Sequence, residues 1–391
     1  MTGVRVLPSA HSAAFLPAGS ALLRRPRAPN RVRPGEFLQT FETRALVYDA
    51  FWHADGARVL LVGPPPMNLW PQIRAAHYLA LPSKTPLRAR YHRSLSTMIT
   101  ELLAVPADTS EVVMSLAGHE FALLVQPSSA NDLAGRNALF TMSKDNDLAW
   151  IREWAHYHAA VHRADAIVFF DNGSTAYAPA EIESTLLGVA GIDKVAVLSL
   201  PYAYGATDMA VLNNPYYTLF LQVSAMTVAL RRYAPRAAGL LNCDVDELVA
   251  TPKGTNIFDL VGASPKGLVV MKGQWVEPLA DHPVGQPATH RDFHFRLRDA
   301  AQRVSRPKKW ALAPTRRWLD SLDVYPYMHW IAGRPLFAKA MPESTFYWHF
   351  KGINTRWKDK RAELSPSRDA IERDDRLGDA MAVLTTPKAI A

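Results

Sequence analysis

The sequence predicts an α/β fold, in which a mostly parallel sheet carries helices on its faces and a smaller β-rich domain precedes it. Between about residues 139 and 243, apolar strand-like runs alternate with helix-like segments, and this alternation is typical of βαβ units. Upstream, as far as about residue 135, short strand-like runs bounded by Gly and Pro recur without such helices. That pattern indicates a small β-rich N-terminal domain.

The alternating part begins with LFTMS (139–143), a buried-looking strand that leads through the polar turn SKDND into a helix. In this helix Trp150, Trp154 and His158 fall near one face. A continuous apolar strand, ADAIVFFD (164–171), follows and ends in strong turn residues. The order then continues with a helix, a strand, a helix and a strand at 180–192, 194–201, 218–234 and 239–243.

The β-rich region contains ARVLLVG (57–63), and the runs EVVMSL and EFALLVQ around Gly118 predict a hairpin. We therefore expect four parts: a basic Pro/Arg-rich segment, a β-rich domain, the α/β domain and a C-terminal tail, at residues 1–36, 37–135, 136–360 and 361–391.

Composition narrows the class of protein. The chain is 48% hydrophobic and 20% charged, which is typical of a globular protein. No apolar run reaches the roughly 18–20 residues of a membrane-spanning helix, and the N-terminus is a poor secretory signal. The single cysteine, Cys243, excludes an intrachain disulfide and a cysteine-built zinc site. We expect a cytoplasmic protein.

The formal net charge of +8 suggests affinity for anions, and much of it lies in two stretches, residues 24–33 and 356–361. Two interpretations stay open for these stretches. They can be solvated basic surfaces, or they can contact phosphates or lipids, which would bring the protein to the inner face of a membrane.

The run LLNCDVDELV places Asp244 and Asp246 directly after a buried-looking strand. Their spacing of two can send both carboxylates to one side, where they can share one hard divalent cation. Asp171 ends the upstream strand in the same manner. Open α/β sheets bind ligands at the carboxyl ends of their strands, so this context favours a functional site over isolated turns.

The ordered motifs SKDND, REWAHYH, VFFDNGS and LLNCDVDELV resemble those of bacterial glycosyltransferases of the family 2 and family 92 type. The resemblance runs through roughly residues 139–250, with fainter similarity to about 360. It implies a GT-A fold, a nucleotide-sugar donor with uridine as the default nucleotide, and Mn²⁺ or Mg²⁺. It also implies transfer of a sugar, a hexose by expectation, to a hydroxyl of a glycan or other acceptor, as in surface polysaccharide synthesis.

The resemblance assigns roles position by position. Donor-binding residues would be Asn146, Asp147, Asp171, Asn172 and Asp244, with His349 and Lys351 at the diphosphate. Metal ligands would be Asp244, Asp246 and His329, with Glu247 behind them. The chain departs from the family pattern at Asp147, where glutamate is usual, and at Asp145, where lysine is usual.

An inverting transfer needs a general base, and Glu277, Asp281 and Asp292 are left as candidates. Trp275 is either a platform for a sugar ring or a core residue. His158 and His162 stand at i, i+4 spacing without a third ligand nearby, which favours packing over a zinc site.

Two rival functions stay in view. A metal-dependent phosphohydrolase also needs acids at strand ends, although it usually has a larger cluster of acids and histidines. A non-enzymatic nucleic-acid or membrane-surface protein would interleave basic and aromatic residues on the core, whereas the core motifs here are acidic. We expect no nucleic-acid partner, and the oligomeric state is left open.

Overall fold

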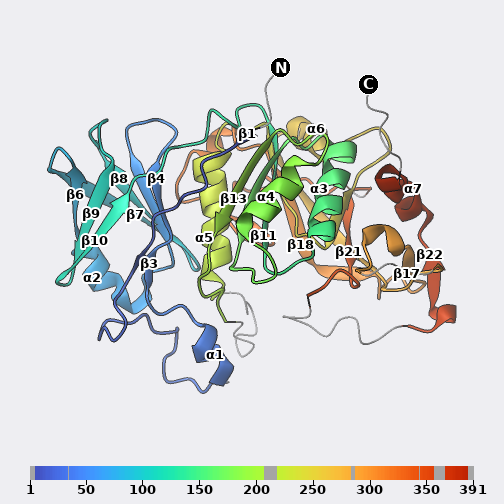
Figure 1. Ribbon diagram of the computed structural model, residues 1–391, viewed down its shortest axis with the longest axis horizontal. Coiled ribbons are helices and arrows are strands. Elements are labelled where there is room, and N and C mark those ends of the chain that lie inside the picture. The colour runs from blue at the N-terminus through green and yellow to red at the C-terminus, as the bar shows by residue number, and fades with distance from the viewer. Residues whose placement is uncertain are drawn as a thin grey trace.

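The computed structural model describes residues 5–33, 35–206, 218–282, 287–342, 344–355 and 366–385. Two large sheets dominate the fold, with the N-terminal sheet at the left of Figure 1 and the main sheet at its centre. Helix α5 (Phe220–Val228) stands between them.

The main sheet has nine strands in the order β1-β13-β12-β11-β14-β18-β16-β21-β15. All of them run in one direction except β18 and β15, which are antiparallel to their neighbours. The sheet is therefore mostly parallel, as the sequence predicts. Its strands are β1 (Arg5–Val6), β11 (Asn137–Ser143), β12 (Ala166–Asp171), β13 (Lys194–Ser199), β14 (Gly239–Asn242), β15 (Glu247–Ala250), β16 (Leu268–Val276), β18 (Val304–Leu312) and β21 (Phe346–Phe350).

Both faces of this sheet are buried, which explains the continuous apolar run of β12. Val168 and Phe170 join the core that α5 shares, while Ile167 and Phe169 join the core on the opposite face. That second core is covered by α3 (Leu148–His162), α4 (Pro179–Leu187), α6 (Ile257–Ala263) and α7 (Asp375–Thr385).

Local signals define the ends of α3. The Asp147 carboxylate accepts a hydrogen bond from the Ala149 amide and caps the first turn. Arg163, with φ of 56°, adopts the left-handed conformation that ends the helix. The predicted strand–helix–strand order from β11 through β14 is confirmed. The last helix is split into α5 and a single wide turn, η2 (Ala229–Tyr233).

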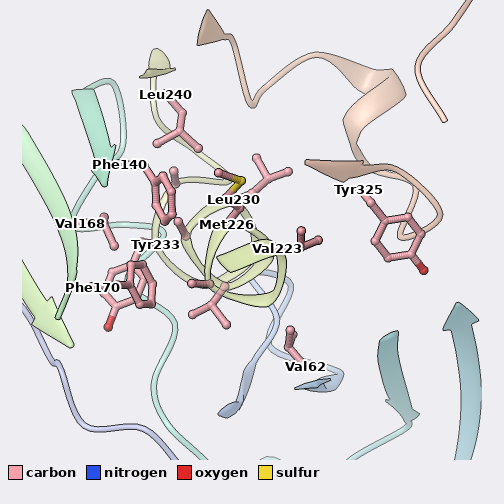
Figure 2. Packing of buried hydrophobic residues seen from close by; sticks show 14 of the residues in the cluster. Val62, Phe140, Val168, Phe170, Val223, Met226, Leu230, Tyr233, Leu240 and Tyr325 are labelled. Carbon is pink, nitrogen blue, oxygen red and sulfur yellow. The ribbon is translucent and has the colours of Figure 1, made fainter. Parts of the chain in front are cut away.

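Helix α5 joins the two sheets into one core. All nine of its residues are buried, and Figure 2 shows Val223 and Met226 packed among side chains of the main sheet such as Phe140. Val62 of the N-terminal sheet belongs to the same cluster. A helix that is apolar on every side needs burial on every side, and the second sheet supplies it.

The N-terminal sheet is antiparallel, with the order β10-β9-β6-β7-β8-β5-β4. The predicted hairpin at Gly118 is confirmed, because β9 and β10 pair through a turn with positive φ at Ala117 and Gly118. The strands are β4 (Asp49–Trp52), β5 (Val59–Gly63), β6 (His77–Leu81), β7 (Thr85–Arg93), β8 (Met98–Leu103), β9 (Glu111–Leu116) and β10 (His119–Leu124). Helix α2 (Trp70–Arg74) lies beside them, after the short turn η1 (Met67–Leu69).

The N-terminal segment packs against both the main sheet and the N-terminal sheet. Strand β1 extends the main sheet, and β2 (Ala14–Phe15) pairs with β3 (Ala45–Val47), before and after helix α1 (Gly35–Thr40). The Arg24 guanidinium is buried and donates to the carbonyls of Pro65, Glu42 and Ala45. The interpretation of this stretch as a solvated arm is therefore wrong for Arg24. The predicted domain boundaries stay a prediction.

The remaining elements are short. Two small pairs, β17 (Phe295–Leu297) with β22 (Ile371–Arg373) and β19 (Tyr325–Pro326) with β20 (Ile331–Ala332), are accompanied by the turns η3 (His290–Asp292), η4 (Arg317–Leu319) and η5 (Arg368–Ala370). The basic stretch at 356–361 lies outside the described residues. Within the described ranges, no helix combines the length and the apolar character needed to cross a membrane.

Candidate active site

The strand directions bring the acidic motifs to one edge of the main sheet. Strands β11, β12, β14, β16 and β21 end at this edge, whereas β15 and β18 begin there because they run the other way. A pocket opens at this edge, and Asp244, Asp246 and Glu247 line it together with His349 and Lys309.

Asp246, Glu247 and His349 form a compact cluster. Glu247 and His349 are partners in the β15–β21 ladder, and the His349 Nε2 lies 3.0 Å from the Asp246 carboxylate. One potential ligand atom from each of the three residues lies within 4.8 Å of the others. Two carboxylates and an imidazole at this separation are a donor set that suits a divalent cation.

The ring of His349 is held from two sides. Its Nδ1 lies 2.9 Å from the Ser305 hydroxyl, so Nε2 is the nitrogen directed at Asp246. The Trp275 ring stacks on it with centroids 4.2 Å apart. Gly273 lets Ser305 pack close to the β16 backbone, because a Cβ at this position would lie 2.6 Å from the Ser305 Cβ and from the Tyr347 hydroxyl. Trp275 thus supports a pocket residue, which neither interpretation of Trp275 from the sequence anticipated.

Asp244 and Glu247 share a buried lysine. The Lys309 Nζ lies 2.6 Å from Asp244 Oδ2 and 2.9 Å from Glu247 Oε2. Glu247 Oε2 also accepts a hydrogen bond from the Asp244 amide. Asp244 Oδ1 is buried and has no hydrogen-bond partner among the described residues. A carboxylate oxygen left in this way beside the cluster fits a site that binds a cation.

Burial and charge perturb the titrating groups here. Burial raises the pKa of Glu247 to about 7, although Lys309 opposes the shift. Burial alone would lower the pKa of Lys309, but the Asp244 and Glu247 carboxylates hold it well above its ordinary value. The amine therefore stays charged, and the pocket contains a fixed internal cation.

The ends of β11 and β12 supply polar groups to the same pocket. Ser143, Lys144, Asn146 and Asn172 line it. The Asn146 amide donates to the Ser143 hydroxyl, and the Asn172 amide donates to the carbonyls of Leu200 and Tyr202. Both predicted asparagines thus lie in the pocket with the acidic cluster.

Two predicted donor-binding acids have partners within their own turns. The Asp147 side chain caps α3. Asp171 is buried and accepts hydrogen bonds from the Ser174 amide and hydroxyl, and neither acid lines the pocket. In this structure both carboxylates shape the turns that position Asn146 and Asn172.

The two predicted histidines occupy different places. His349, expected at the diphosphate, lies in the metal-suited cluster. His329, expected as a metal ligand, lines the pocket, but its Nδ1 lies 3.1 Å from the Lys308 carbonyl. Burial and the nearby Lys309 lower the pKa of His329 to about 4. The cluster with Asp246 therefore contains the later of the two histidines.

None of the three predicted bases lines the pocket, and neither does Lys351. Lys351 Nζ contacts both oxygens of the buried Glu277, at 2.7 and 2.9 Å. Asp281 is paired with Arg373 and His282 near the surface, and Asp292 closes the turn at Thr289. Lys351 is thus occupied by a carboxylate, which differs from the expected position at a diphosphate.

The histidines on α3 are packing residues, as the sequence favours. His158 and His162 are fully buried, and their ring nitrogens contact the carbonyls of Trp154 and Val249. Cys243 is buried beside them, with its Sγ 3.8 Å from the His158 Nε2.

Sequence reasoning missed Lys309 and Ser305. Lys309 had little signal, because it follows Arg306 and Lys308 and so resembles the solvated start of the apolar run WALA. Ser305 had none, because a serine near a strand start is unremarkable until its neighbour is known.

Comparisons with known proteins find only distant similarity. No protein-family model matches the chain, and no curated protein matches it. Similar solved structures include residues 1–349 of TarS from S. aureus, at 13% identity and a TM-score of 0.31, covering 55% of this chain and 60% of that one. The chain thus spans less than two thirds of that TarS structure.

Two structures of LgtC are also similar. One is an active-site mutant and the other is the galactosyltransferase LgtC in complex with donor and acceptor sugar analogues. They are 14% and 15% identical to this chain, with a TM-score of 0.28 each, and cover 64% of it and 98% of LgtC. These TM-scores are low and carry no conclusion about function.

Proposed function

We propose that this protein is a metal-dependent glycosyltransferase that moves a sugar from a nucleoside diphosphate to an acceptor hydroxyl. The observation that carries the proposal is the cluster of Asp246, Glu247 and His349 at the carboxyl edge of a mostly parallel sheet. The cluster shares one pocket with Asn146 and Asn172, whose side-chain carbonyl oxygens would accept hydrogen bonds from a nucleoside while their amide groups hold the surrounding turns.

The donor set fits Mn²⁺ or Mg²⁺. Asp246, Glu247 and His349 would hold the ion, and the buried Asp244 Oδ1 is a further oxygen beside them. When bound, the ion supplies positive charge against the diphosphate that leaves as the sugar–oxygen bond breaks. Ser305 and Trp275 keep the His349 ring in position for this task.

Lys144 is the second basic side chain of the lining, at the end of β11. We assign it to the anionic part of the donor, in place of Lys351, whose amine faces Glu277. The nucleoside would then lie against the ends of β11 and β12, and the sugar would lie toward the acidic cluster.

Direct displacement inverts the anomeric centre and needs a base opposite the diphosphate. Of the three predicted acids, Glu277 is connected most closely to the pocket, since its partner Lys351 follows His349 by two residues. For Glu277 to act as the base, its ion pair with Lys351 must open when the acceptor binds.

A thermal-shift panel tests the proposal. It would contain nucleoside diphosphates and nucleotide hexoses, with uridine compounds first, with and without Mn²⁺. We expect one nucleotide to raise the melting temperature only with Mn²⁺. Asp246→Asn should abolish this rise, and Asp320→Asn, at an exposed position, should keep it.

Product analysis separates the rivals. Transfer of the sugar to an added acceptor supports a glycosyltransferase. Release of inorganic phosphate without transfer would instead indicate a phosphohydrolase, and stabilisation by oligonucleotides or acidic lipid alone would indicate a binding protein. A role in surface polysaccharide synthesis would follow only if glycan acceptors are used.

A further inference from the structure

The buried Lys309 distinguishes this acidic cluster from a simple metal site. Its side chain is 2% exposed and projects from β18 between two carboxylates, Asp244 and Glu247. Burying an ammonium group is costly unless charged partners compensate it, so a lysine here needs a specific reason.

Lys309 fixes which oxygen atoms face the pocket. It binds Oδ2 of Asp244 and Oε2 of Glu247, and the Asp244 amide also donates to that second oxygen. Asp244 Oδ1 is left buried without a hydrogen-bond partner in the described part of the chain. Since one oxygen of each carboxylate is held by the protein, the other is presented in a defined direction.

Lys309 also sets the charge of the site. Asp244, Asp246 and Glu247 carry three negative charges when ionised, and Lys309 reduces the sum to minus two. One divalent cation balances this charge, and a second would leave an excess of two positive charges beside the buried Lys309 ammonium.

We propose that Lys309 is a positioning residue that acts as a built-in cation. It orients Asp244 and Glu247, keeps the acidic cluster stable before metal arrives, and restricts the site to a single divalent ion. This inference rests on the proposed metal-dependent function.

The test compares Lys309→Met, Lys309→Arg and the charge-matched double variant Lys309→Met/Glu247→Gln with the wild type. Melting temperatures are measured at pH 8 without metal and with Mn²⁺, and Mn²⁺ binding is measured by isothermal titration calorimetry. We expect the wild type to bind one Mn²⁺ per chain.

Loss of the charge should act mainly on the metal-free protein. In Lys309→Met we expect a large fall in melting temperature without metal, partial restoration by Mn²⁺, and Mn²⁺ affinity at least about tenfold higher, because a nearby positive charge is gone. Lys309→Arg should bind one Mn²⁺ with an affinity within a few-fold of the wild type. The double variant, which also loses the charge of a proposed metal ligand, should regain the metal-free melting temperature of the wild type but bind Mn²⁺ more weakly.

A lysine that only fills space predicts a different pattern. Lys309→Met would then lose equal stability with and without Mn²⁺, and Glu247→Gln would restore nothing; either result overturns the inference. If Lys309→Met does not fold, the double variant decides, since it must fold with a metal-free melting temperature close to that of the wild type.

The same experiment distinguishes a failure of the Lys309 inference from a failure of the proposed metal-dependent function. A wild type that binds no Mn²⁺, with or without nucleoside diphosphate, contradicts the metal-dependent function. Rescue of the metal-free melting temperature by Glu247→Gln would still decide whether Lys309 balances charge.

Discussion

Two buried ionic regions of this protein differ in their charge balance. At the junction of the two sheets, Asp49 of β4 meets Arg232 of η2 at 2.9 Å, and both side chains are almost fully buried. At the carboxyl edge of the main sheet, three carboxylates line the pocket with one buried lysine, Lys309, which contacts two of them. The first region is neutral and closed, while the second carries excess negative charge and opens to solvent.

This difference separates a structural ion pair from a candidate site. Asp49 has all its oxygen atoms engaged, by Arg232 and by the amides of Ser12 and Ala50. At the pocket, in contrast, a carboxylate oxygen, Asp244 Oδ1, has no hydrogen-bond partner within the described ranges, whereas the atom of the closed pair without one is a donor, Arg232 Nη2. Burial occurs in both regions, so burial alone indicates nothing about function; the unbalanced charge does.

The largest effect is expected at the closed pair. Asp49→Ala would leave the Arg232 guanidinium buried without its counter-charge, and we expect a loss of about 3–5 kcal/mol in the free energy of unfolding. Urea denaturation measures this loss, which should be the same with and without Mn²⁺. A loss below about 1 kcal/mol would show that the junction tolerates an unpaired charge.

His158 and His162 on α3 are buried polar groups whose environment is closed to solvent, like that of the Asp49–Arg232 pair. His162 is held neutral, since Nε2 donates to the Val249 carbonyl and Nδ1 accepts from the Ile257 amide. Burial lowers the pKa of His162 to about 4 from an ordinary value of 6.5. As the pH falls from 6.5 toward 4, the unfolded chain gains a proton that the folded protein does not.

Stability should therefore fall over this range by about 3 kcal/mol from His162. The measurement is the difference in unfolding free energy between the wild type and His162→Gln at several pH values. This difference should shrink as the pH drops from 7 to 4. A difference independent of pH would show that His162 is not held neutral.

A substitution in the cluster of Asp246, Glu247 and His349 should lower activity more than it lowers stability. Asp246→Asn removes a proposed metal ligand, and we expect turnover of the donor to fall at least about 100-fold, which corresponds to roughly 2.7 kcal/mol. The metal-free melting temperature should stay equal or rise, because one charge of a repelling group is gone. A large fall in that melting temperature would place Asp246 with the structural ion pairs instead.

The smallest effect concerns the support of His349. Ser305→Ala removes the hydroxyl 2.9 Å from Nδ1, and we expect Mn²⁺ affinity to fall about tenfold, as for other residues that orient a metal-bound histidine. Calorimetric titration measures this change, with the exposed Ser83→Ala as control. Unchanged affinity would mean that the Trp275 stack is sufficient to hold the ring.

Much of the α/β core could be predicted because its local patterns agree with the fold. Strand β12 is buried along its whole length, as its continuous apolar run predicts. The face of α3 that contains Trp154 is buried as its helical spacing predicts. The link between the two sheets could not be foreseen. The apolar sequence of α5 predicts that all sides of the helix are buried, but it does not predict which segments cover them.

The candidate site was predictable only in part. Asp244 and Asp246 follow an apolar strand, and parallel strands must place such ends at one edge of the sheet. The partner of Asp246 was not predictable, because His329 and His349 have similar aromatic neighbours in the sequence. Pairing of β21 with β15 places His349 beside Asp246, and the β19–β20 hairpin gives His329 a different neighbour.

The sequence by itself determined the alternating strands and helices, the hairpin at Gly118 and the acidic ends of the strands, since these depend on residues close together in the chain. Only the tertiary structure decided that Lys309 lies between Asp244 and Glu247, some 60 residues before it, and that Lys351 faces Glu277. The reason is physical. A buried charge takes its partner from whichever strand the sheet places beside it, and the order of strands in the sheet is set by packing of the whole chain.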